Sequence, residues 1–146
     1  MKILIINGPN MNMLGIREPD IYGHETLTDL EDIIRKHANV LGIETEFFQS
    51  NHEGAIVDRI QQAYGKVNGI VINPAAYTHT SVAIHDALTA VAIPTVEVHV
   101  SDINSREEYR HRSFIKDACI AQIAGHGFNG YLEAVDLLLK TLSMKR

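Results

Sequence analysis

Cysteine is nearly absent from this chain of 146 residues, and so are long apolar runs. Its single cysteine, Cys119, has no partner for an internal disulfide bond, so nothing points to an oxidising compartment. The longest uninterrupted apolar run has about five residues, whereas a helix needs about 20 to cross a bilayer. The apolar N-terminus reaches the turn residues Asn7-Gly8-Pro9 too early to be a secretory signal. These absences predict a cytoplasmic protein that does not associate with membranes.

An excess of basic charge is also lacking, because 13 Lys and Arg residues face 18 Asp and Glu residues, for a formal net charge of −5. A chain with this balance is not expected to bind nucleic acid. Three arginines nevertheless lie within seven positions, namely Arg106, Arg110 and Arg112. They indicate either a site for a small anionic ligand or an ordinary solvated helix face.

The composition is that of an ordinary folded domain, with 45% hydrophobic and 21% charged residues. A disordered chain would have fewer apolar residues and a larger net charge. Because the length suits one domain, we expect residues 1–146 to form a single unit with its own core.

Short apolar segments alternate along the chain with longer segments that have apolar residues at helical spacing. The predicted strands span residues 2–7, 43–49, 69–73, 93–98 and 118–124, and the predicted helices span residues 26–41, 54–64, 81–91 and 130–142. Thr28 and Glu31 form a possible capping box in the first helix. The alternation predicts an α/β fold, a flavodoxin-like doubly wound sheet of five parallel strands in the order 2-1-3-4-5, with three α/β/α layers.

Polar residues gather where three of the predicted strands end. In an open parallel sheet, ligands bind beyond the carboxyl ends of the strands, near the point where the strand order reverses. Strands 1, 3 and 4 meet there, and the residues at their ends include Asn7, Asn10, Asn73, His79, Glu97 and His99. This edge of the sheet is therefore the predicted functional site.

Glu97 and His99 lie two positions apart on a predicted strand, so their side chains project from the same face. A carboxylate beside an imidazole orients the ring, fixes its tautomer and favours its protonated form, as a general acid requires. Two other interpretations stay open. The pair can be a purely structural hydrogen bond, or it can join His79 in a metal site, although no HExxH or Cys/His spacing supports zinc.

Residues 11–25 are predicted to form a long loop, which holds two glycines and a proline. A loop of this length in a compact domain usually acts as a lid or a binding segment. It contains Arg17 and Tyr22. Tyrosine, with a pKa of about 10, acts as a base near neutral pH only if a cation lies within about 4–6 Å, and Arg17 is a candidate. Alternatively, Arg17 is an exposed loop residue and Tyr22 packs independently of it.

The segment Gly125–Gly130 matches the GxGxxG pattern of dinucleotide-binding sites. Such a site also needs a further strand and an acidic residue about 20 positions on, and only 16 residues follow Gly130 in this sequence. We therefore interpret the segment as a turn between a strand and a helix. Cys119 lies in the predicted fifth strand among apolar neighbours and is expected to be an inert core residue.

Four segments make the chain similar to the type II 3-dehydroquinate dehydratases, also called 3-dehydroquinases, over nearly its whole length. These segments are Asn7–Gly15 followed by Arg17–Pro19 and Tyr22–Gly23; Gln49–Gly54; Asn73–Ser81; and Glu97–Ser101 followed by Arg106–Glu107 and Arg110–His111. The departures from the family are small: Met11 and Met13 replace leucines, Asp102 an asparagine, Tyr109 a phenylalanine, and His85 a frequent arginine.

The resemblance implies a single catalytic domain that needs no metal and no cofactor. The implied reaction is the anti elimination of water from 3-dehydroquinate, through an enolate, to give 3-dehydroshikimate. This step belongs either to the shikimate pathway of aromatic amino acid biosynthesis or to quinate breakdown. The resemblance also implies a homododecamer, built as a tetramer of trimers.

The same resemblance implies a catalytic role for several residues. Tyr22 would remove the proton beside the ketone, and Arg17 would keep that tyrosine ionised. His99, held by Glu97, would protonate the departing hydroxyl. Enolate chemistry needs a base, an acid and a group that stabilises the oxyanion, and the predicted site holds candidates for all three.

The remaining implied roles concern the enolate and the substrate. Asn10 and Asn73 would position a water that stabilises the enolate. The implied substrate-binding residues are Asn73, His79, Asp86, Val100, Ser101 and Arg110. Of these, Asp86 would reach the site of a neighbouring subunit.

Two other functions remain open from the residues themselves. One is a flavodoxin-like binding or signalling module for a phosphate or nucleotide. A receiver domain of that kind needs clustered aspartates after strand 1, and a flavin module favours a Ser/Thr/Gly-rich loop, whereas this chain has Pro9, Asn10 and Asn12 there. The other is a catalytically inactive assembly subunit, which would have no need for so many polar residues at one edge of the sheet.

Overall fold

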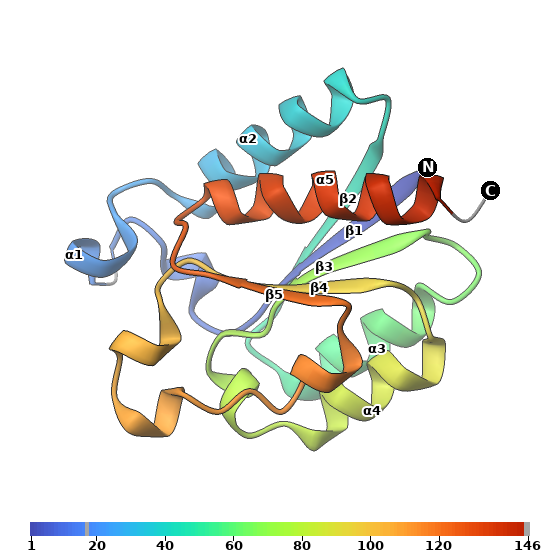
Figure 1. The fold of residues 1–146 in the computed structure, drawn as a ribbon. Coiled ribbons are helices and arrows are strands. Elements are labelled where there is room, and N and C mark those ends of the chain that lie inside the picture. Colours follow the sequence, from blue (N-terminus) through green and yellow to red (C-terminus); the bar gives the residue numbers. More distant parts are fainter. Residues whose placement is uncertain (17, 145–146) are drawn as a thin grey trace.

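Five parallel strands form a single sheet in the computed structural model, which describes residues 1–16 and 18–144, the side chain of Tyr22 excepted. They are β1 (Lys2–Asn7), β2 (Glu44–Gln49), β3 (Gly69–Asn73), β4 (Thr95–His99) and β5 (Ala121–Ala124). Their order is β2-β1-β3-β4-β5 (Figure 1). The predicted fold class and strand order are confirmed, and the order reverses between β1 and β3.

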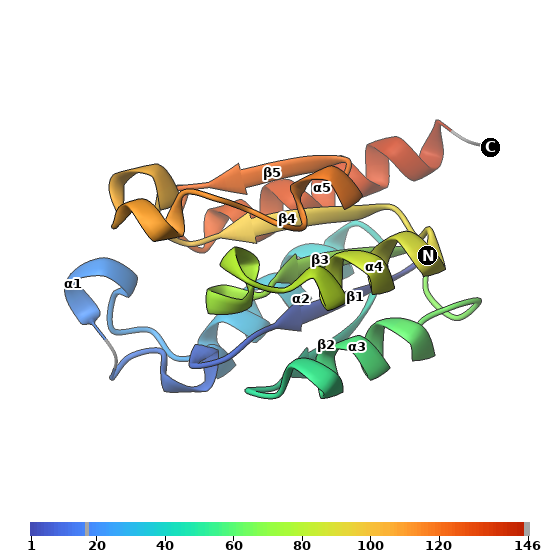
Figure 2. The ribbon, with the colours of Figure 1, turned by 90° about the horizontal axis from the view of Figure 1, so that it is seen from below.

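Helices cover both faces of this sheet. α2 (Leu27–Val40) and α5 (Asn129–Ser143) lie on one face, and α3 (Glu53–Gln62) and α4 (Val82–Val91) lie on the other (Figure 1 and Figure 2). The three layers are those expected from the sequence. Of the helices in the described part of the chain, none is long and apolar enough to cross a membrane.

Side chains along β1 alternate between the two faces of the sheet, so this one strand contributes to the apolar core on each side. Ile3 and Ile5 join the apolar core under α2 and α5, whereas Leu4 and Ile6 join the core under α3 and α4. All four are fully buried, and each contributes about 1.5–3 kcal/mol to the hydrophobic free energy of folding. β1 is therefore an interior strand of the sheet, with β2 on one side and β3 on the other.

Gly8 allows the ends of β1 and β3 to approach each other closely. Its backbone N–H donates a 2.8 Å hydrogen bond to the carbonyl of Asn73. A Cβ atom at this position would lie 2.3 Å from the carbonyl oxygen of Pro74, so no other residue fits without moving the backbone. The two strand ends are thus held together at the point where the strand order reverses.

The start of α2 differs from the expected one. The capping box is formed by Thr26 and Asp29, each of which bonds the backbone N–H of the other, and not by Thr28 and Glu31. Both pairs have the same spacing, but Thr26 has the extended backbone that an N-cap requires. The box two positions earlier is therefore the one that forms.

The segment 11–25, expected as a loop, contains two short helical elements. Met11–Met13 form a 3₁₀ turn, and α1 (Pro19–Tyr22) begins with a proline, which suits the first position of a helix. Met11 and Leu14 are each only 5% exposed and join the core under α2 and α5. The first part of the segment is therefore anchored to the core.

Cys119 was expected inside the fifth strand, and this placement is wrong. The 3₁₀ turn Lys116–Ala118 occupies the first part of that segment, and β5 begins only at Ala121. Cys119 lies before the strand and packs, partly buried, against the core under α3 and α4. Burial, followed by the charge of Glu97, raises the pKa of its thiol to about 12, so the thiol stays protonated and unreactive. Every other predicted boundary lies within two residues of the observed one.

Candidate active site

A cavity of about 130 Å³ lies beyond the carboxyl ends of β1, β3 and β4. Seven of the predicted site residues line it: Asn10, Asn73, His79, His99, Val100, Ser101 and Arg110. Six lining residues were not predicted: Pro9, Met11, Ala75, Ala76, Ile103 and Arg106. Pro9 and Met11 flank Asn10 in the chain, whereas the other four lie two or more positions from any predicted residue. Only Arg106 had a signal in the sequence, as one of the three clustered arginines.

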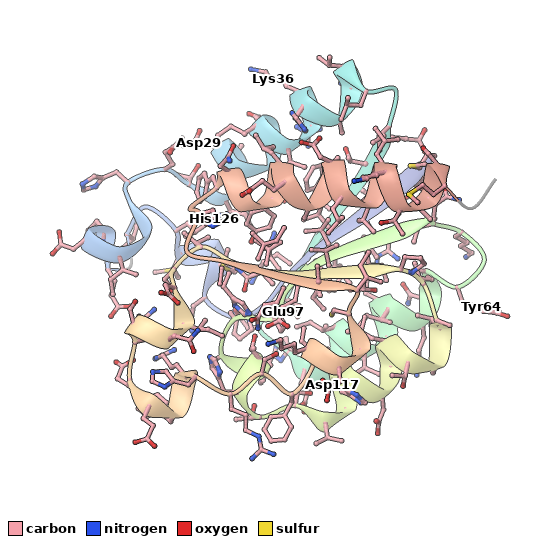
Figure 3. All side chains as sticks on the ribbon, in the orientation of Figure 1. Asp29, Lys36, Tyr64, Glu97, Asp117 and His126 are labelled. Carbon is pink, nitrogen blue, oxygen red and sulfur yellow. The ribbon has the colours of Figure 1, made fainter. Side chains whose placement is uncertain are left out.

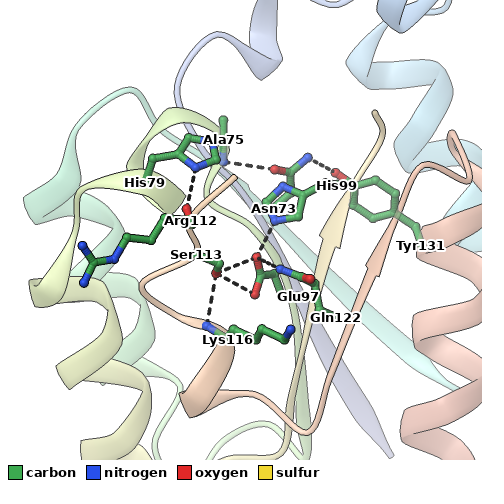
Figure 4. Close-up of polar contacts among 10 residues, drawn as sticks. All are labelled: Asn73, Ala75, His79, Glu97, His99, Arg112, Ser113, Lys116, Gln122 and Tyr131. Atoms are coloured by element: carbon green, nitrogen blue, oxygen red, sulfur yellow. Dashed lines mark hydrogen bonds and ion pairs between the residues drawn. The ribbon is translucent and has the colours of Figure 1, made fainter. Parts of the chain in front are cut away.

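β4 carries Glu97 and His99 on one face, as their spacing predicts. Nε2 of His99 donates a hydrogen bond to Oε2 of Glu97 (Figure 4). The Glu97 side chain is fully buried, and Figure 3 shows it inside the molecule, while Tyr64 projects from the surface. Since Nε2 is occupied by the carboxylate, Nδ1 is the ring nitrogen of His99 that can exchange a proton with a ligand.

Two further side chains hold the Glu97 carboxylate. The Ser113 hydroxyl donates to its two oxygens at 3.0 and 2.9 Å, and Nε2 of Gln122 donates to Oε2 at 3.0 Å. Burial alone raises the pKa of Glu97, but the hydrogen bonds and the charge of its partners outweigh burial and hold the pKa below its ordinary value. Glu97 is therefore ionised at neutral pH, and an ionised carboxylate stabilises a positively charged imidazole ring.

His79 lies at the end of the 3₁₀ turn Ala75–His79, and its ring faces the cavity. Its Nδ1 lies 2.7 Å from the carbonyl oxygen of Arg112. Because a carbonyl can only accept, Nδ1 carries the hydrogen and Nε2 is the acceptor of the neutral ring. Burial lowers the pKa of His79, as do the positive charges of His99 and Arg110, although the Arg112 carbonyl opposes this. The ring is therefore predominantly neutral at pH 7.

The side-chain amide of Asn73 is held from both sides (Figure 4). The Ala75 N–H donates to its Oδ1 at 3.0 Å, and its Nδ2 donates to the Tyr131 hydroxyl at 3.0 Å and to Sδ of Met11 at 3.7 Å. Tyr131 donates its own proton to Oδ1 of Asn7 at 2.6 Å. Both Nδ2 hydrogens of Asn73 are thus directed into the protein, so Oδ1 is the atom with a lone pair left for a ligand.

Two of the three clustered arginines line the cavity. Arg110 was predicted as a site residue, and Arg106, which was not, donates a 3.3 Å hydrogen bond to the Ser101 hydroxyl. The guanidinium of Arg112 lies outside the cavity, 4.3 Å from the ring centre of Phe114. Two guanidinium groups in one small cavity favour an anionic ligand over the alternative of a solvated helix face.

Asn10 lines the cavity with a φ of 69°, a left-handed backbone that asparagine tolerates better than most residues.

Three other predicted site residues, Asp86, Arg17 and Tyr22, are not among the described residues that line the cavity. Asp86 lies on the exposed side of α4, 3.1 Å from Nδ1 of His85, and is not among the described residues that line the cavity. Arg17 lies outside the described residues, and so does the side chain of Tyr22, whose backbone ends α1.

Sequence reasoning missed three residues that support the cavity from behind. Ser113 and Gln122 lie 16 and 25 positions from Glu97, and Tyr131 lies 58 positions from Asn73. No local motif connects positions so far apart. The one available signal was Gln122 itself, a polar residue in the otherwise apolar strand β5.

The geometry gives no support to a metal site at His79, Glu97 and His99. Nδ1 of His79 donates to a carbonyl, and the oxygens of Glu97 accept from three donors. Among residues 1–16 and 18–144, no group of three or more His, Cys, Asp or Glu side chains is arranged to hold a metal ion.

The segment Gly125–Gly130 forms the turn from β5 into α5, as predicted. Gly125 and Gly127 have φ values of 84° and 59°. Their N–H groups donate to the carbonyls of His99 and Val100 at 3.3 and 3.1 Å. These amides are used inside the protein, so they do not form a cradle for phosphate.

Comparison with known proteins places the chain in one family. Residues 1–139 match the family described as dehydroquinase class II. The chain is 58% identical over 134 residues to the 3-dehydroquinate dehydratase of Endomicrobium trichonymphae, with 92% of this chain and 94% of the relative covered. It is 55% identical to catabolic 3-dehydroquinase 1 of Fusarium vanettenii, with 97% and 98% covered.

A solved structure supports the same assignment. The type II dehydroquinase from Butyrivibrio crossotus is 54% identical and superposes with a TM-score of 0.94, covering 95% of this chain and 97% of the other. Sequence and fold therefore agree over almost the whole length. The chain belongs to the class II dehydroquinase family, which is a family of hydro-lyases.

Proposed function

We propose that the cavity beyond β1, β3 and β4 is where this chain removes water from 3-dehydroquinate. As a member of its family, the chain is a 3-dehydroquinate dehydratase of the shikimate or the quinate pathway. The observation that carries the location is the Glu97–His99 pair, buried at the wall of a cavity that also holds two arginines. The product of the elimination is the conjugated enone 3-dehydroshikimate.

His99 is the proposed general acid. Its Nε2–H is committed to the ionised Glu97 carboxylate, so the proton for the departing hydroxyl comes from Nδ1. The leaving group then departs as water. The negative charge of Glu97 stabilises the imidazolium before the transfer, and its hydrogen bond fixes the plane of the ring.

Tyr22 is the proposed base, with Arg17 as the cation that keeps it ionised. The support for this assignment is the family resemblance together with the position of α1. The neighbours of Tyr22 in the chain, Ile21 and Gly23, share a groove with Val100 and Ser101, which also line the cavity. An anti elimination needs the base and the acid on opposite faces of the substrate, and a base on α1 and an acid on β4 belong to different elements that could flank it.

The enolate intermediate needs a hydrogen-bond donor at its oxygen. We assign this task to a water held by Asn10 and Asn73. Since only Oδ1 of Asn73 has a lone pair to spare, the water would donate one hydrogen to Asn73 and the other to the enolate oxygen.

The rest of the cavity suits a carboxylate that carries several hydroxyl groups. Arg110 presents a planar guanidinium, which can bind a carboxylate through two hydrogen bonds. Neutral His79 offers an acceptor at Nε2 for a substrate hydroxyl. Ser101 and the backbone of Val100 lie beside them.

We further propose that the enzyme is a dodecamer, a tetramer of trimers, in the cytoplasm, and that Asp86 completes the site of a neighbouring subunit. Asp86 is exposed on α4 and takes no part in its own cavity, which supports such a role. Analytical ultracentrifugation of the wild type and of Asp86→Ala tests this. We expect twelve subunits in the wild type and a loss of activity in Asp86→Ala. A wild type that is active as a monomer contradicts the proposal.

The function is tested by adding 3-dehydroquinate to the purified enzyme and following the ultraviolet absorbance of the enone, with and without prior treatment with EDTA. We expect the absorbance to rise in both cases. His99→Gln should lower the rate at least ~10²-fold. The matched control is His126→Gln, because His126 also pairs with a glutamate but lies outside the cavity. No rise with the wild type contradicts the function, and a fully active His99→Gln contradicts the site.

A further inference from the structure

Ser113 lies in the loop that joins the arginine-bearing turns to β5, and its hydroxyl makes two kinds of hydrogen bond. It accepts from the backbone N–H of Lys116 at 3.2 Å, and it donates to Oε1 and Oε2 of Glu97 at 3.0 and 2.9 Å. A serine hydroxyl has a single proton. Because Lys116 approaches the oxygen as a donor, that proton is directed to the carboxylate.

The preceding residue holds the other histidine of the cavity. The carbonyl of Arg112 accepts the Nδ1–H of His79 at 2.7 Å. Two consecutive residues therefore support the two histidines of the cavity. The Arg112 carbonyl binds His79, and the Ser113 hydroxyl binds Glu97, which holds His99 (Figure 4). The guanidinium of Arg112 itself points away from this cluster.

We propose that Ser113 is a positioning residue for the dehydration, which sets the orientation of His99 by holding the Glu97 carboxylate between its own hydroxyl and the amide of Gln122. This inference rests on the function proposed above. Ser113 is not itself among the residues that line the cavity, so it acts through Glu97.

The arrangement of donors explains why one hydroxyl matters. Among the residues that the structure describes, only Ser113 donates to Oε1 as well as Oε2, whereas His99 and Gln122 both donate to Oε2. Without Ser113, all remaining donors act on one oxygen, and the carboxylate is free to rotate about its last bond. Because the Nε2–H of His99 follows that rotation, the ring turns and Nδ1 is no longer aligned with the leaving group. Proton transfer is slower when the donor and the acceptor are misaligned.

A simpler role for Ser113 is to hold the first residue of the 3₁₀ turn Lys116–Ala118, by accepting a hydrogen bond from the backbone N–H of Lys116. That role predicts a change in the loop as a whole, and hence in the Arg112 carbonyl and His79. The positioning role predicts a change at His99 with His79 intact. His79 therefore reports on the integrity of the turn, and His99 reports on the action of the hydroxyl.

The kinetic test compares Ser113→Ala with Ser113→Thr and Ser105→Ala. Ser105 also carries a hydrogen-bonded hydroxyl in a neighbouring 3₁₀ turn, but it donates to the Asp102 carbonyl and makes no contact with Glu97. We expect Ser113→Ala to lower kcat at least ~10-fold with KM changed less than ~2-fold. Ser113→Thr keeps the hydroxyl and should stay within ~3-fold of the wild type, as should Ser105→Ala.

The spectroscopic test uses ¹⁵N-labelled, substrate-free enzyme, in which the ring N–H protons of His79 and His99 are observed. In Ser113→Ala, the His99 Nε2–H signal should broaden or disappear, and the His79 Nδ1–H signal should persist. Unchanged kcat and an unchanged His99 signal overturn the proposal, and so does the loss of both signals together. An inactive wild type overturns the proposed function and the positioning role with it, whereas an active wild type with normal Ser113→Ala overturns the positioning role alone.

Discussion

Tyr131, on α5, accepts a 3.0 Å hydrogen bond from the side-chain amide of Asn73, at the end of β3. The same hydroxyl donates to Oδ1 of Asn7, at the end of β1, so one buried tyrosine joins the two strand ends where the sheet order reverses. Burial raises the pKa of Tyr131 well above its ordinary value, with the bond from Asn73 opposing this only in part. Tyr131 is therefore a fixed, neutral hydroxyl and not a base.

Tyr131→Phe should destabilise the enzyme by about 1–3 kcal/mol, because it leaves a donor of Asn73 and an acceptor of Asn7 without a partner in the core. Urea unfolding, followed by circular dichroism, gives the free energy of unfolding. Tyr64→Phe is the control, since Tyr64 is 70% exposed. Equal stability of the two variants would mean that the hydroxyl of Tyr131 does not hold the strand ends.

The sequence predicts the sheet well because its signals are local. The continuous apolar run at Ile3–Ile6 is what a strand buried on both faces requires, and the turn residues that follow it mark its end. Once the strands are ordered, the convergence of Asn10, Asn73 and His99 follows from topology, since the carboxyl ends of parallel strands meet at one edge.

The support of the site was not predicted, because it depends on packing between distant segments. Asn7 and Tyr131 are 124 positions apart, and their hydrogen bond exists only because α5 packs on the face of the sheet where its first turn reaches the ends of β1 and β3. Likewise, Thr26 and Thr28 have equally good capping partners by spacing, and the backbone conformation at Thr26 decides between them. These contacts depend on how the folded chain packs, and no periodic pattern in the sequence marks the residues that form them.

Glu97→Gln should lower kcat by roughly 10²–10⁴-fold, the usual range for a proton-transfer step, with a much smaller change in KM. The amide has nearly the shape of the carboxylate, but it carries no charge to stabilise the His99 ring. Glu133→Gln is a matched control, because Glu133 pairs with His126 at 2.7 Å outside the cavity. Steady-state kinetics measure both, and equal kcat values would contradict the role of Glu97.

His79→Asn should flatten the pH dependence of stability on the acid side. The pKa of His79 is lowered in the folded enzyme, so as the pH falls through about 6.5 the unfolded chain binds a proton here that the folded chain does not. The free energy of unfolding of the wild type therefore decreases from that pH downward, until the lowered pKa is reached. Asparagine does not titrate, and its amide can still donate to the Arg112 carbonyl.

The measurement is urea unfolding of the wild type and of His79→Asn at several pH values between about 5 and 8. The carboxylates that titrate at lower pH are common to both proteins, so the difference between the two curves isolates His79. We expect the wild type to lose more stability than the variant below pH ~6.5. Parallel curves would show that the pKa of His79 is the same in the folded and unfolded states.

Tyr22→Phe should abolish turnover while the substrate still binds, because the change removes only the ionisable oxygen of the proposed base. We expect kcat to fall at least ~10²-fold, and 3-dehydroquinate still to raise the melting temperature. Tyr109→Phe is the control, since Tyr109 is 67% exposed and does not line the cavity. Turnover close to that of the wild type in Tyr22→Phe is the outcome that contradicts the assignment.

Arg110→Lys should raise KM while kcat changes little. Arg110 lines the cavity and is the proposed partner of the substrate carboxylate, and a lysine cannot form the two parallel hydrogen bonds of a guanidinium. A hydrogen bond to a charged group is worth about 1.5–3 kcal/mol, so the loss of one corresponds to a roughly 10- to 100-fold increase in KM. Arg112→Lys makes the same change two positions away, where the guanidinium lies over Phe114 and outside the cavity, and KM should stay the same. If both variants raised KM equally, the effect would come from a change in the loop as a whole and not from the contact of Arg110 with the carboxylate. If neither did, the carboxylate would have to be bound elsewhere, with Arg106 as the next candidate in the cavity.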